Sequence, residues 1–520
     1  MSWEKEVEAI ADRRRQALAQ GGEEAVAAHR AKGRLPLRER IDLLLDEDSF
    51  REQGRIAGAA EYDEEGNETG FTPANFILGL GRMDGRRVVV GGEDFTVRGG
   101  SPTPAGLRKS VYTEELAVRY RVPLIRLHEG GGGSVAGTGG GKAPSGPVGS
   151  PVFDRPRFRS VAEAMATVPV ASAALGPVAG LPAARLVASH FTVMTRETAQ
   201  VLIAGPAVVK RALNQEATKE SLGGPDVHLK NGVVDNVARD EADALAQIRR
   251  FLSYMPDNVD QLPPVTPCDD DRNRREEMLL SVVPKDRRQP YDMRKVMRAI
   301  FDTDSLFEVS RKWGPGIITA YGRLNGHPVG VIANDCRFYA GAMSADGARK
   351  FRRFVEICET FHLPVVCLVD EPGFMIGEQS EREGAIRPGT AAVLAAASCS
   401  VPWASVVVKK VYGVAGAAHF GDHAHVLAWP SAESGALPVE GGVAVAFGRD
   451  IAAAADPEAR RRELEEQLAR RQSPMPRAES FAYHDIIDPR ETRPALCDWI
   501  DWSWPLLEGL RGPRLFPMLP

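Results

Sequence analysis

The sequence lacks the common signatures of a side-chain nucleophile, a phosphate loop or a zinc site. It contains no GxSxG, no GxxxxGK[ST] and no HExxH. Its six cysteines form no CxxC pair and have no ligand spacing with histidine, so we expect buried, reduced thiols and no metal site. Chemistry that relies on backbone groups would explain the absence of an obvious nucleophile.

Charge of one sign and long apolar runs are also absent. The 65 basic and 70 acidic residues are interspersed, which argues against binding to nucleic acid or to an anionic membrane. No apolar run reaches the roughly 20 residues of a membrane helix. The first 20 residues form a charged amphipathic pattern unlike a signal or transit peptide. We therefore expect a cytoplasmic globular protein of more than one domain.

An internal repeat organises the chain. The segment GRMDG at 81–85 matches GRLNG at 322–326, a spacing of 241 residues. The same spacing pairs Asp94 with Asp335, Arg108 and Lys109 with Arg349 and Lys350, and Glu129 with Asp370. It changes to 233 farther on, where Gly180 matches Gly413. We predict tandem related domains, residues 1–260 and 261–520, joined by a proline-rich, charged linker at 257–278.

Each half alternates strand-like and helix-like segments. The central strands, VPLIRLHE and LPVVCLVDE, are apolar almost throughout rather than alternating. Such strands are typical of sheets covered by helices, so the sequence predicts an α/β fold. In such folds ligands bind where strands end and helices begin.

Small-residue turns follow the later strand of each half, at 176–186 (GPVAGLPAARL) and 411–420 (VYGVAGAAHF). A turn of this kind that opens a helix exposes backbone N–H groups at the positive helix end, which suits an oxyanion or enolate. Tight packing of helix on strand is the alternative interpretation. Two copies at matched repeat positions favour the functional one.

A second pair of turns follows the central strands, at 128–134 (HEGGGGS) and 370–377 (DEPGFMIG), and each contains an acidic residue. The alternative for these acids is a helix cap. The cluster HFGDHAH at 419–425 resembles a metal-binding stretch but lacks carboxylate or cysteine partners at a suitable spacing. We therefore expect no metal there, and a lone histidine near these turns is expected to be a structural hydrogen-bond partner.

The sequence resembles the carboxyltransferase (β) subunit of biotin-dependent acyl-CoA carboxylases, the propionyl-CoA and methylcrotonyl-CoA carboxylase type. The resemblance runs from about residue 30 to the C-terminus. It rests on AKGRLPLRERIDLLLD (31–46), GGEDFTVRGGS (91–101), IAGPAVVK (203–210), ESLGGPDVHLKNGVVD (220–235), VDEPGF (369–374), AIRPGT (385–390), AWPSAE (428–433) and DIIDPRETR (485–493).

The resemblance implies two crotonase-like domains and transfer of CO2 from carboxybiotin to the α-carbon of an acyl-CoA. It places the acyl enolate on the N–H groups of Val414 and Ala415, directly after Gly413. It places the biotin ureido oxygen on Gly180 and Leu181. Biotin itself then serves as the base, so no side-chain base is required.

The resemblance also implies the binding surfaces and partners. Gly131, Gly132 and Ala179 would border the space where CoA and biotin meet, with CoA mainly on the first domain of one subunit and biotin and the acyl group on the second domain of another. Arg108 and Lys109 are candidates for the CoA phosphates, unless they form only a solvated helix face. The chain has no Ala-Met-Lys-Met-type biotinyl motif, so biotin carboxylase and biotin carrier must be partner chains. A dimer is the minimum assembly and a hexamer is usual.

Several positions depart from the family pattern. The second glycine of each turn is replaced by Leu181 or Val414, and Pro182 is expected to restrict Leu181 to extended geometry. Gly416 and Ala417 replace acidic or aromatic residues, which would open space where the acyl chain is selected, and Phe374 is a further candidate for the substrate pocket. We therefore predict a substrate other than propionyl-CoA, longer or branched. The stretch at 137–149 is expected to form a flap.

Three functions are compatible with this pattern. The first is a biotin-dependent acyl-CoA carboxyltransferase. The second is an acyl-CoA decarboxylase that uses the same enolate site. The third is a non-catalytic scaffold subunit paired with an active paralogue.

Overall fold

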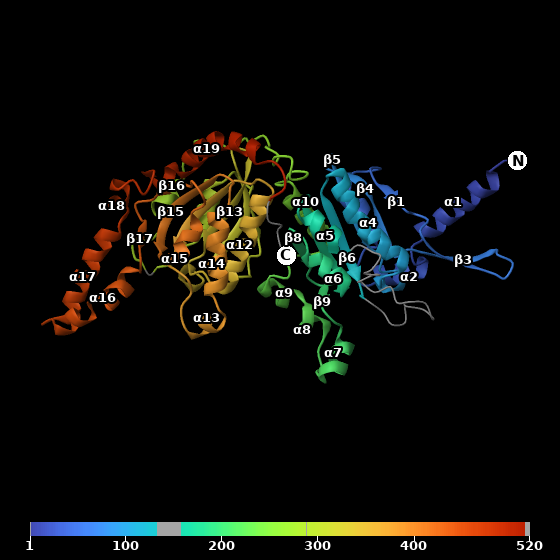
Figure 1. Ribbon diagram of the computed structural model, residues 1–520, viewed down its shortest axis with the longest axis horizontal. Coiled ribbons are helices and arrows are strands. Elements are labelled where there is room, and N and C mark those ends of the chain that lie inside the picture. The colour runs from blue at the N-terminus through green and yellow to red at the C-terminus, as the bar shows by residue number, and fades with distance from the viewer. Residues whose placement is uncertain (1, 133–155, 157, 288, 515–520) are drawn as a thin grey trace. The chain divides into compact units, whose positions relative to one another are not determined.

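The computed structural model describes residues 2–132, 156, 158–287 and 289–514. It divides into two compact units, one formed by residues up to Val259 with the last described residues and one by Asp260–Gly512 (Figure 1). The predicted flap at 137–149 lies outside the described residues. In the part of the chain that is described, no helix combines the length and apolar character needed to cross a membrane.

The first unit contains a mixed sheet in the order β1-β4-β5-β6-β7-β8-β10, with β9 paired to the end of β7. Strands β1, β4 and β5 pair antiparallel, and the strands from β5 onward pair parallel. The strands are β1 (Arg51–Gln53), β4 (Phe76–Met83), β5 (Arg86–Glu93), β6 (Leu124–Gly130), β7 (Val170–Ala179), β8 (Phe191–Thr195), β9 (Gln200–Leu202) and β10 (Asn236–Ala238), with a separate hairpin of β2 (Gly58–Tyr62) and β3 (Glu68–Pro73).

The second unit repeats this topology in the order β11-β12-β13-β14-β15-β16-β18, with β17 paired to β15. Strands β4 and β12 begin 241 residues apart, and β7 and β15 begin 233 apart, so the predicted internal repeat and α/β class are confirmed. The strands are β11 (Phe307–Val309), β12 (Ile317–Leu324), β13 (His327–Asn334), β14 (Val365–Glu371), β15 (Trp403–Tyr412), β16 (His425–Ala428), β17 (Glu433–Gly435) and β18 (Asp485–Ile486).

Helices cover the sheets. In the second unit α12 and α14 pack together over one face (Figure 1). The helices of the first unit are α1 (Glu4–Leu18), α2 (Glu23–Arg30), α3 (Leu37–Leu44), α4 (Pro104–Tyr120), α5 (Phe158–Met165), α6 (Leu181–Val187), α7 (Pro206–Leu213), α8 (Lys219–Gly223), α9 (Pro225–Asn231) and α10 (Glu241–Leu252). Those of the second are α11 (Met293–Ile300), α12 (Ala345–Thr360), α13 (Glu378–Arg382), α14 (Ile386–Ala397), α15 (Gly413–Gly416), α16 (Val439–Ala453), α17 (Pro457–Gln472), α18 (Pro474–Glu479) and α19 (Thr492–Ser503).

The apolar strands are buried on both faces, as their sequence predicts. Alternate residues of β13, β14 and β15, such as Val331, Leu368 and Val406, pack with α11 and α19 on one face. On the other face Gly330 lies under α12, where a Cβ atom would come within 2.4 Å of the Cys358 sulfur. The two long helices α4 and α12 begin at matched caps, because the side chains of Thr103 and Ser344 accept from N–H groups in the first turn.

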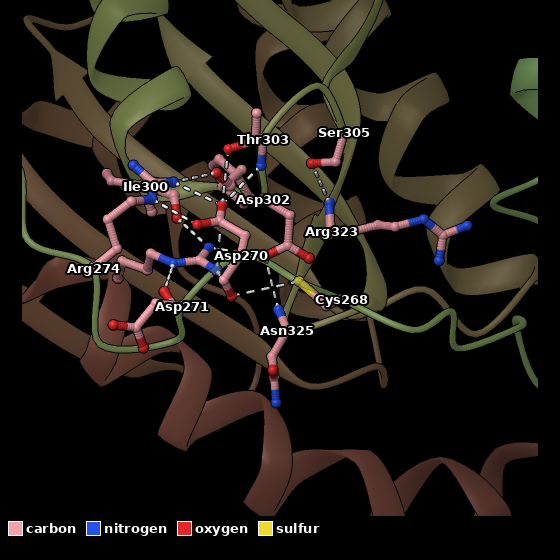
Figure 2. A network of polar contacts seen from close by, with 12 residues as sticks. Cys268, Asp270, Asp271, Arg274, Ile300, Asp302, Thr303, Ser305, Arg323 and Asn325 are labelled. Atoms are coloured by element: carbon pink, nitrogen blue, oxygen red, sulfur yellow. Dashed lines mark hydrogen bonds and ion pairs between the residues drawn. The ribbon is translucent and has the colours of Figure 1, made fainter.

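The segment predicted as a linker is held firmly to the second unit in its later part. Figure 2 shows Asp270 accepting hydrogen bonds from Thr303 and Arg274, beside Asp302, which accepts from the Asn325 N–H at 3.0 Å. The fully buried guanidinium of Arg493 binds Asp302 at 2.8 Å and donates to the carbonyls of Ile300 and Asp271. This segment is therefore part of the second unit rather than a free connector.

Replacing Arg493 by methionine should destabilise the second unit by about 3–5 kcal/mol, because the buried Asp302 carboxylate loses its partner. Denaturant unfolding measures the effect. Arg490→Met is the matched control, since Arg490 forms ion pairs with Asp488 and Glu277 at the surface, where little stability is lost. Equal unfolding midpoints for the two variants would contradict this account.

Candidate functional site

The two predicted turns lie at equivalent places in the two sheets. Strand β7 leads to Gly180, which has φ of 64° and is the N-cap of α6, and β15 leads to Gly413, which has φ of 60° and begins α15. These left-handed values favour glycine, which explains the one glycine that both turns keep. Each short helix leaves its first N–H groups without acceptors inside the helix.

The donors at the two turns differ. The Gly180 N–H donates to the Leu202 carbonyl at 3.3 Å, a bond that continues the pairing of β7 with β9. The Leu181 N–H, at the first position of α6, is therefore the better placed donor in the first unit. In the second unit Val414 has a side chain that is 64 % exposed, whereas Ala415 is fully buried. A branched residue at position 414 thus leaves the main-chain donor in place.

The expected effect of Pro182 on Leu181 is wrong. Leu181 is the first residue of α6 and Pro182 is the second. Proline is tolerated in the first turn of a helix because the N–H that it lacks would have no helical acceptor. The first-turn position overrides the tendency of a residue before proline to be extended.

The glycines after β6 lie beside the first turn. Gly132 has φ of 76°, and a Cβ atom on it would come within 2.9 Å of the Ala179 carbonyl oxygen. The Gly131 N–H donates to the Gly99 carbonyl at 3.0 Å. The structure thus brings together Gly131, Gly132, Ala179 and Gly180, four of the residues singled out from the sequence.

The acidic residues Glu129 and Asp370, near the ends of the central strands, are structural anchors, and Asp370 does not cap α13, whose N-cap is Gly377. Glu129 is fully buried, with Arg34 at 2.5 Å, Arg40 at 2.7 Å and His29 at 3.3 Å. Burial would raise the pKa of Glu129, but the hydrogen bond from His29 and the charges of Arg40 and Arg34 lower it below its usual value. At the matched position, Asp370 accepts from the Tyr291 hydroxyl at 3.0 Å and lies 3.6 Å from the Lys410 ammonium.

Arg108 and Lys109 border a cavity of about 730 Å³ in the first unit, which is also lined by Tyr112 and Arg159. Arg108 is exposed. Lys109 is buried, and its ammonium donates to the Gly54 carbonyl at 3.2 Å. Its repeat partner Lys350 donates in the same way to Ser310 at 3.2 Å. Both lysines hold the loop after the edge strand, so Lys109 has a structural task besides the predicted one.

The three predicted substrate-pocket residues lie in different environments. Ala417 is exposed and directly follows α15. Gly416 is buried, and a Cβ atom there would come within 2.8 Å of a Val411 methyl group, so packing accounts for this glycine. The Phe374 ring is half-buried and lies against Gly389 of α14.

The histidines of the cluster at 419–425 point to different partners. His419 is fully buried beside Glu371 at 3.2 Å, His425 packs on His484 with ring centroids 4.8 Å apart, and His423 is exposed. Among the described residues, no group of three or more His, Cys, Asp or Glu side chains is arranged to hold a metal ion.

Besides the contact of His29 with Glu129, two further buried carboxylate–imidazole pairs were not found from the sequence. Glu93, at the end of β5, lies 3.0 Å from His128 on β6. Glu371, at the end of β14, lies 3.2 Å from His419, three residues after α15 ends. The only signal was an acidic residue at the end of an apolar strand, and the sequence does not identify its partner.

The two α/β units share one topology, and in each the longest parallel strand leads into a glycine turn that opens a helix. The chain belongs to the carboxyl transferase domain family, which it matches over residues 28–507. This confirms the predicted family and the assignment as an acyl-CoA carboxyltransferase.

Characterised relatives agree. The chain is 34% identical to the carboxyltransferase subunit of propionyl-CoA carboxylase from Haloferax mediterranei, over 95% of each chain. It is 31% identical to the α subunit of methylmalonyl-CoA decarboxylase from Veillonella parvula, over 95% of this chain and 94% of that one. The solved transcarboxylase 12S, a hexamer with methylmalonyl-CoA bound, superposes with a TM-score of 0.87 at 29% identity, covering 100% of this chain and 98% of that one. The predicted crotonase-like fold is thereby confirmed.

Lys109 gives a pH-dependent prediction. Burial lowers the pKa of Lys109 from 10.5 to about 8. Between these values the unfolded chain binds more protons than the folded one, so this group makes stability rise with pH. The unfolding free energy of wild type relative to Lys109→Met should therefore rise by about 3 kcal/mol from neutral pH to about pH 10.5. Unfolding measured across this range, with Lys210→Met at an exposed lysine as control, tests it, and a flat difference would contradict it.

Proposed function

We propose that this chain transfers a carboxyl group between carboxybiotin on a carrier protein and the α-carbon of an acyl-CoA. The observation that carries the proposal is the pair of glycine turns at matched positions, each of which opens a helix and presents main-chain donors. Carboxybiotin supplies the activated carboxyl group when its carrier docks. The residues of this chain bind the two partners and stabilise the charge that develops between them.

The turn after β15 acts on the acyl-CoA. The N–H groups of Val414 and Ala415 donate to the thioester oxygen, which becomes negative as the α-carbon loses a proton or a carboxylate. The positive end of α15 adds to this effect. Donors fixed before the reaction stabilise such an anion without reorganisation, and each contributes about 3–4 kcal/mol.

The turn after β7 acts on the biotin ureido oxygen, through the N–H of Leu181 and, less directly, Gly180. Gly131, Gly132 and Ala179 lie beside this turn, and they have no bulky side chains that would obstruct the biotin ring. Arg108 is exposed at the rim of the cavity in the first unit, where a guanidinium is suited to a CoA phosphate. Lys109 is a weaker candidate because Gly54 already binds its ammonium.

The acyl group of the substrate is larger than propionyl. Ala417 is small and exposed beside the donors of α15, and we assign it, with Phe374, to the acyl pocket. Gly416 contributes through the backbone only, because its position is packed against Val411. A series of 2-carboxyacyl-CoAs of increasing chain length measures this selectivity, and a preference for methylmalonyl-CoA over every longer member would refute it.

The partners follow from the proposed reaction. Biotin carboxylase and a biotin carrier come from other chains, and six copies of this chain assemble as in transcarboxylase 12S. Native mass spectrometry of the purified chain measures that number.

A decarboxylase is the second candidate, because one relative is a subunit of methylmalonyl-CoA decarboxylase. Loss of CO2 from a 2-carboxyacyl-CoA leaves the same enolate, so the same donors would serve. A scaffold subunit without activity is the third candidate, motivated by Leu181 and Val414 in place of glycine.

One assay separates the three candidates. The purified chain is incubated with free biotin and a series of 2-carboxyacyl-CoAs from malonyl-CoA upward, and loss of the thioester carboxylate is followed. We expect decarboxylated acyl-CoA to form only when biotin is present, with transfer of the carboxyl group to biotin. Loss without biotin would favour the decarboxylase, and no turnover of any member would leave the scaffold.

Val414→Pro tests the enolate donor. It deletes one N–H at the second position of α15, a place that proline tolerates in a helix. The expected loss in kcat is about 100-fold to 1,000-fold. Val414→Ala keeps the N–H and should lose little. Unchanged kcat in a folded Val414→Pro protein that still binds CoA would remove this assignment.

A further inference from the structure

We propose that Glu371 and His419 form a positioning pair that fixes the turn at 413–417 and thereby sets the rate of enolate formation. The inference rests on the proposed function of that turn. Neither residue touches substrate in this account, since both are completely buried. They act by holding the backbone that carries the Val414 and Ala415 donors.

Glu371 is a fully satisfied acceptor. Its Oε1 accepts from the Gly373 N–H at 3.0 Å, and its Oε2 accepts from the Asn334 side chain at 3.0 Å and lies 3.2 Å from His419 Nε2. The donors come from β13, the loop after β14 and the segment after α15. One carboxylate therefore ties the catalytic turn to the two central strands of the sheet.

His419 is anchored at both its side chain and its backbone. Its carbonyl accepts from the Ser405 hydroxyl at 2.6 Å and from the Trp403 indole at 3.0 Å, both on β15. Its ring packs edge-on against Phe351 of α12 at 5.5 Å. His419 closes the 3₁₀ turn Ala417–His419, which continues directly from α15. A shift of the His419 ring would therefore also shift the N–H groups of Val414 and Ala415, which lie only four or five residues earlier in the chain.

The hydrogen-bond pattern assigns the imidazole tautomer. Within the described residues, His419 Nδ1 has no hydrogen-bond partner. A protonated ring would bury a second N–H without an acceptor, which is costly. The neutral ring with its proton on Nε2 avoids that cost and donates to Glu371. The pair is thus a carboxylate and a neutral imidazole, held by one directional bond.

The first unit contains the same kind of pair, built from different strands. Glu93 matches Asn334 in the repeat and Gly130 matches Glu371, so the carboxylate has moved to the neighbouring strand. A Cβ atom on Gly130 would lie 3.4 Å from Glu93 Cγ, so the Glu93 side chain packs beside Gly130. Glu93 contacts His128 at 3.0 Å and lines a small hollow with Leu181 and Pro182. Both turns therefore lie next to a buried carboxylate–imidazole pair, although the two pairs share no matched residues.

His419→Leu and His419→Gln test the inference in the full chain. Leucine removes the bond to Glu371, whereas glutamine can place an amide N–H near the position of Nε2. With the 2-carboxyacyl-CoA that wild type turns over fastest, His419→Leu should lower kcat by about tenfold or more and change KM by less than about threefold. His419→Gln should recover kcat to within about threefold of wild type. Hydrogen exchange of peptides covering 411–420 should be faster in His419→Leu.

Controls separate positioning from general damage. Thr319→Val removes a buried hydrogen bond from Thr319 to the Val309 carbonyl. Thr319 is on β12, three strands from β15, so the variant should leave kcat and exchange at 411–420 unchanged. Because His419→Leu leaves a buried carboxylate short of a donor, Glu371→Gln is a second variant that keeps the side-chain length and should also lower kcat with little change in KM. A folded His419→Leu protein with wild-type kcat and exchange, or a glutamine variant as impaired as the leucine one, would overturn the inference. A wild type without any turnover would refute the proposed function, while the exchange measurement would still decide the positioning role.

Discussion

The fold depends on satisfying carboxylates that are buried where the central parallel strands end. Glu129 and Asp370 occupy matched positions with no exposure to solvent, and an unpaired charge there would cost several kcal/mol. Glu129 pairs with Arg34, between α2 and α3, and with Arg40 of α3, and Arg40 also binds Glu241 of α10 at 2.7 Å. Asp370 accepts hydrogen bonds from the Tyr291 hydroxyl and from the Lys410 N–H of β15. These contacts place the strand ends, and the strand ends place the glycine turns.

Main-chain and side-chain polar groups near the two turns have different surroundings. Main-chain N–H groups at the helix starts are suited to bind an anion, since they carry partial positive charge and need no proton transfer. The polar side chains nearby are turned inward, where Glu93, His128, Glu371 and His419 bond to one another or to the backbone. This arrangement explains why the sequence shows no nucleophile motif although the family is enzymatic.

The sequence predicted the topology well because a repeat records it directly. The spacing of 241 residues, read from short matches such as GRMDG and GRLNG, recurs as the offset between β4 and β12. Pair-wise contacts across strands were not predictable, since nothing local specifies which residues of β5 and β6 share a face at their ends. For example, the sequence did not predict that the carboxylate of the buried pair comes from Glu371 on β14 in the second unit but from Glu93 on β5 in the first. Local rules also failed at Pro182, where the start of a helix overrode the usual preference of the preceding residue.

The replaced glycines are the strongest argument against activity, and the geometry answers it in part. The residue that must be glycine is the one with positive φ, and Gly180 and Gly413 are both retained. The following positions are helical, so leucine and valine can adopt the backbone that glycine would have and still present an N–H. Val414 is 64 % exposed, so its side chain lies outside the packed core. The substitutions therefore leave the main-chain N–H groups of both turns in place.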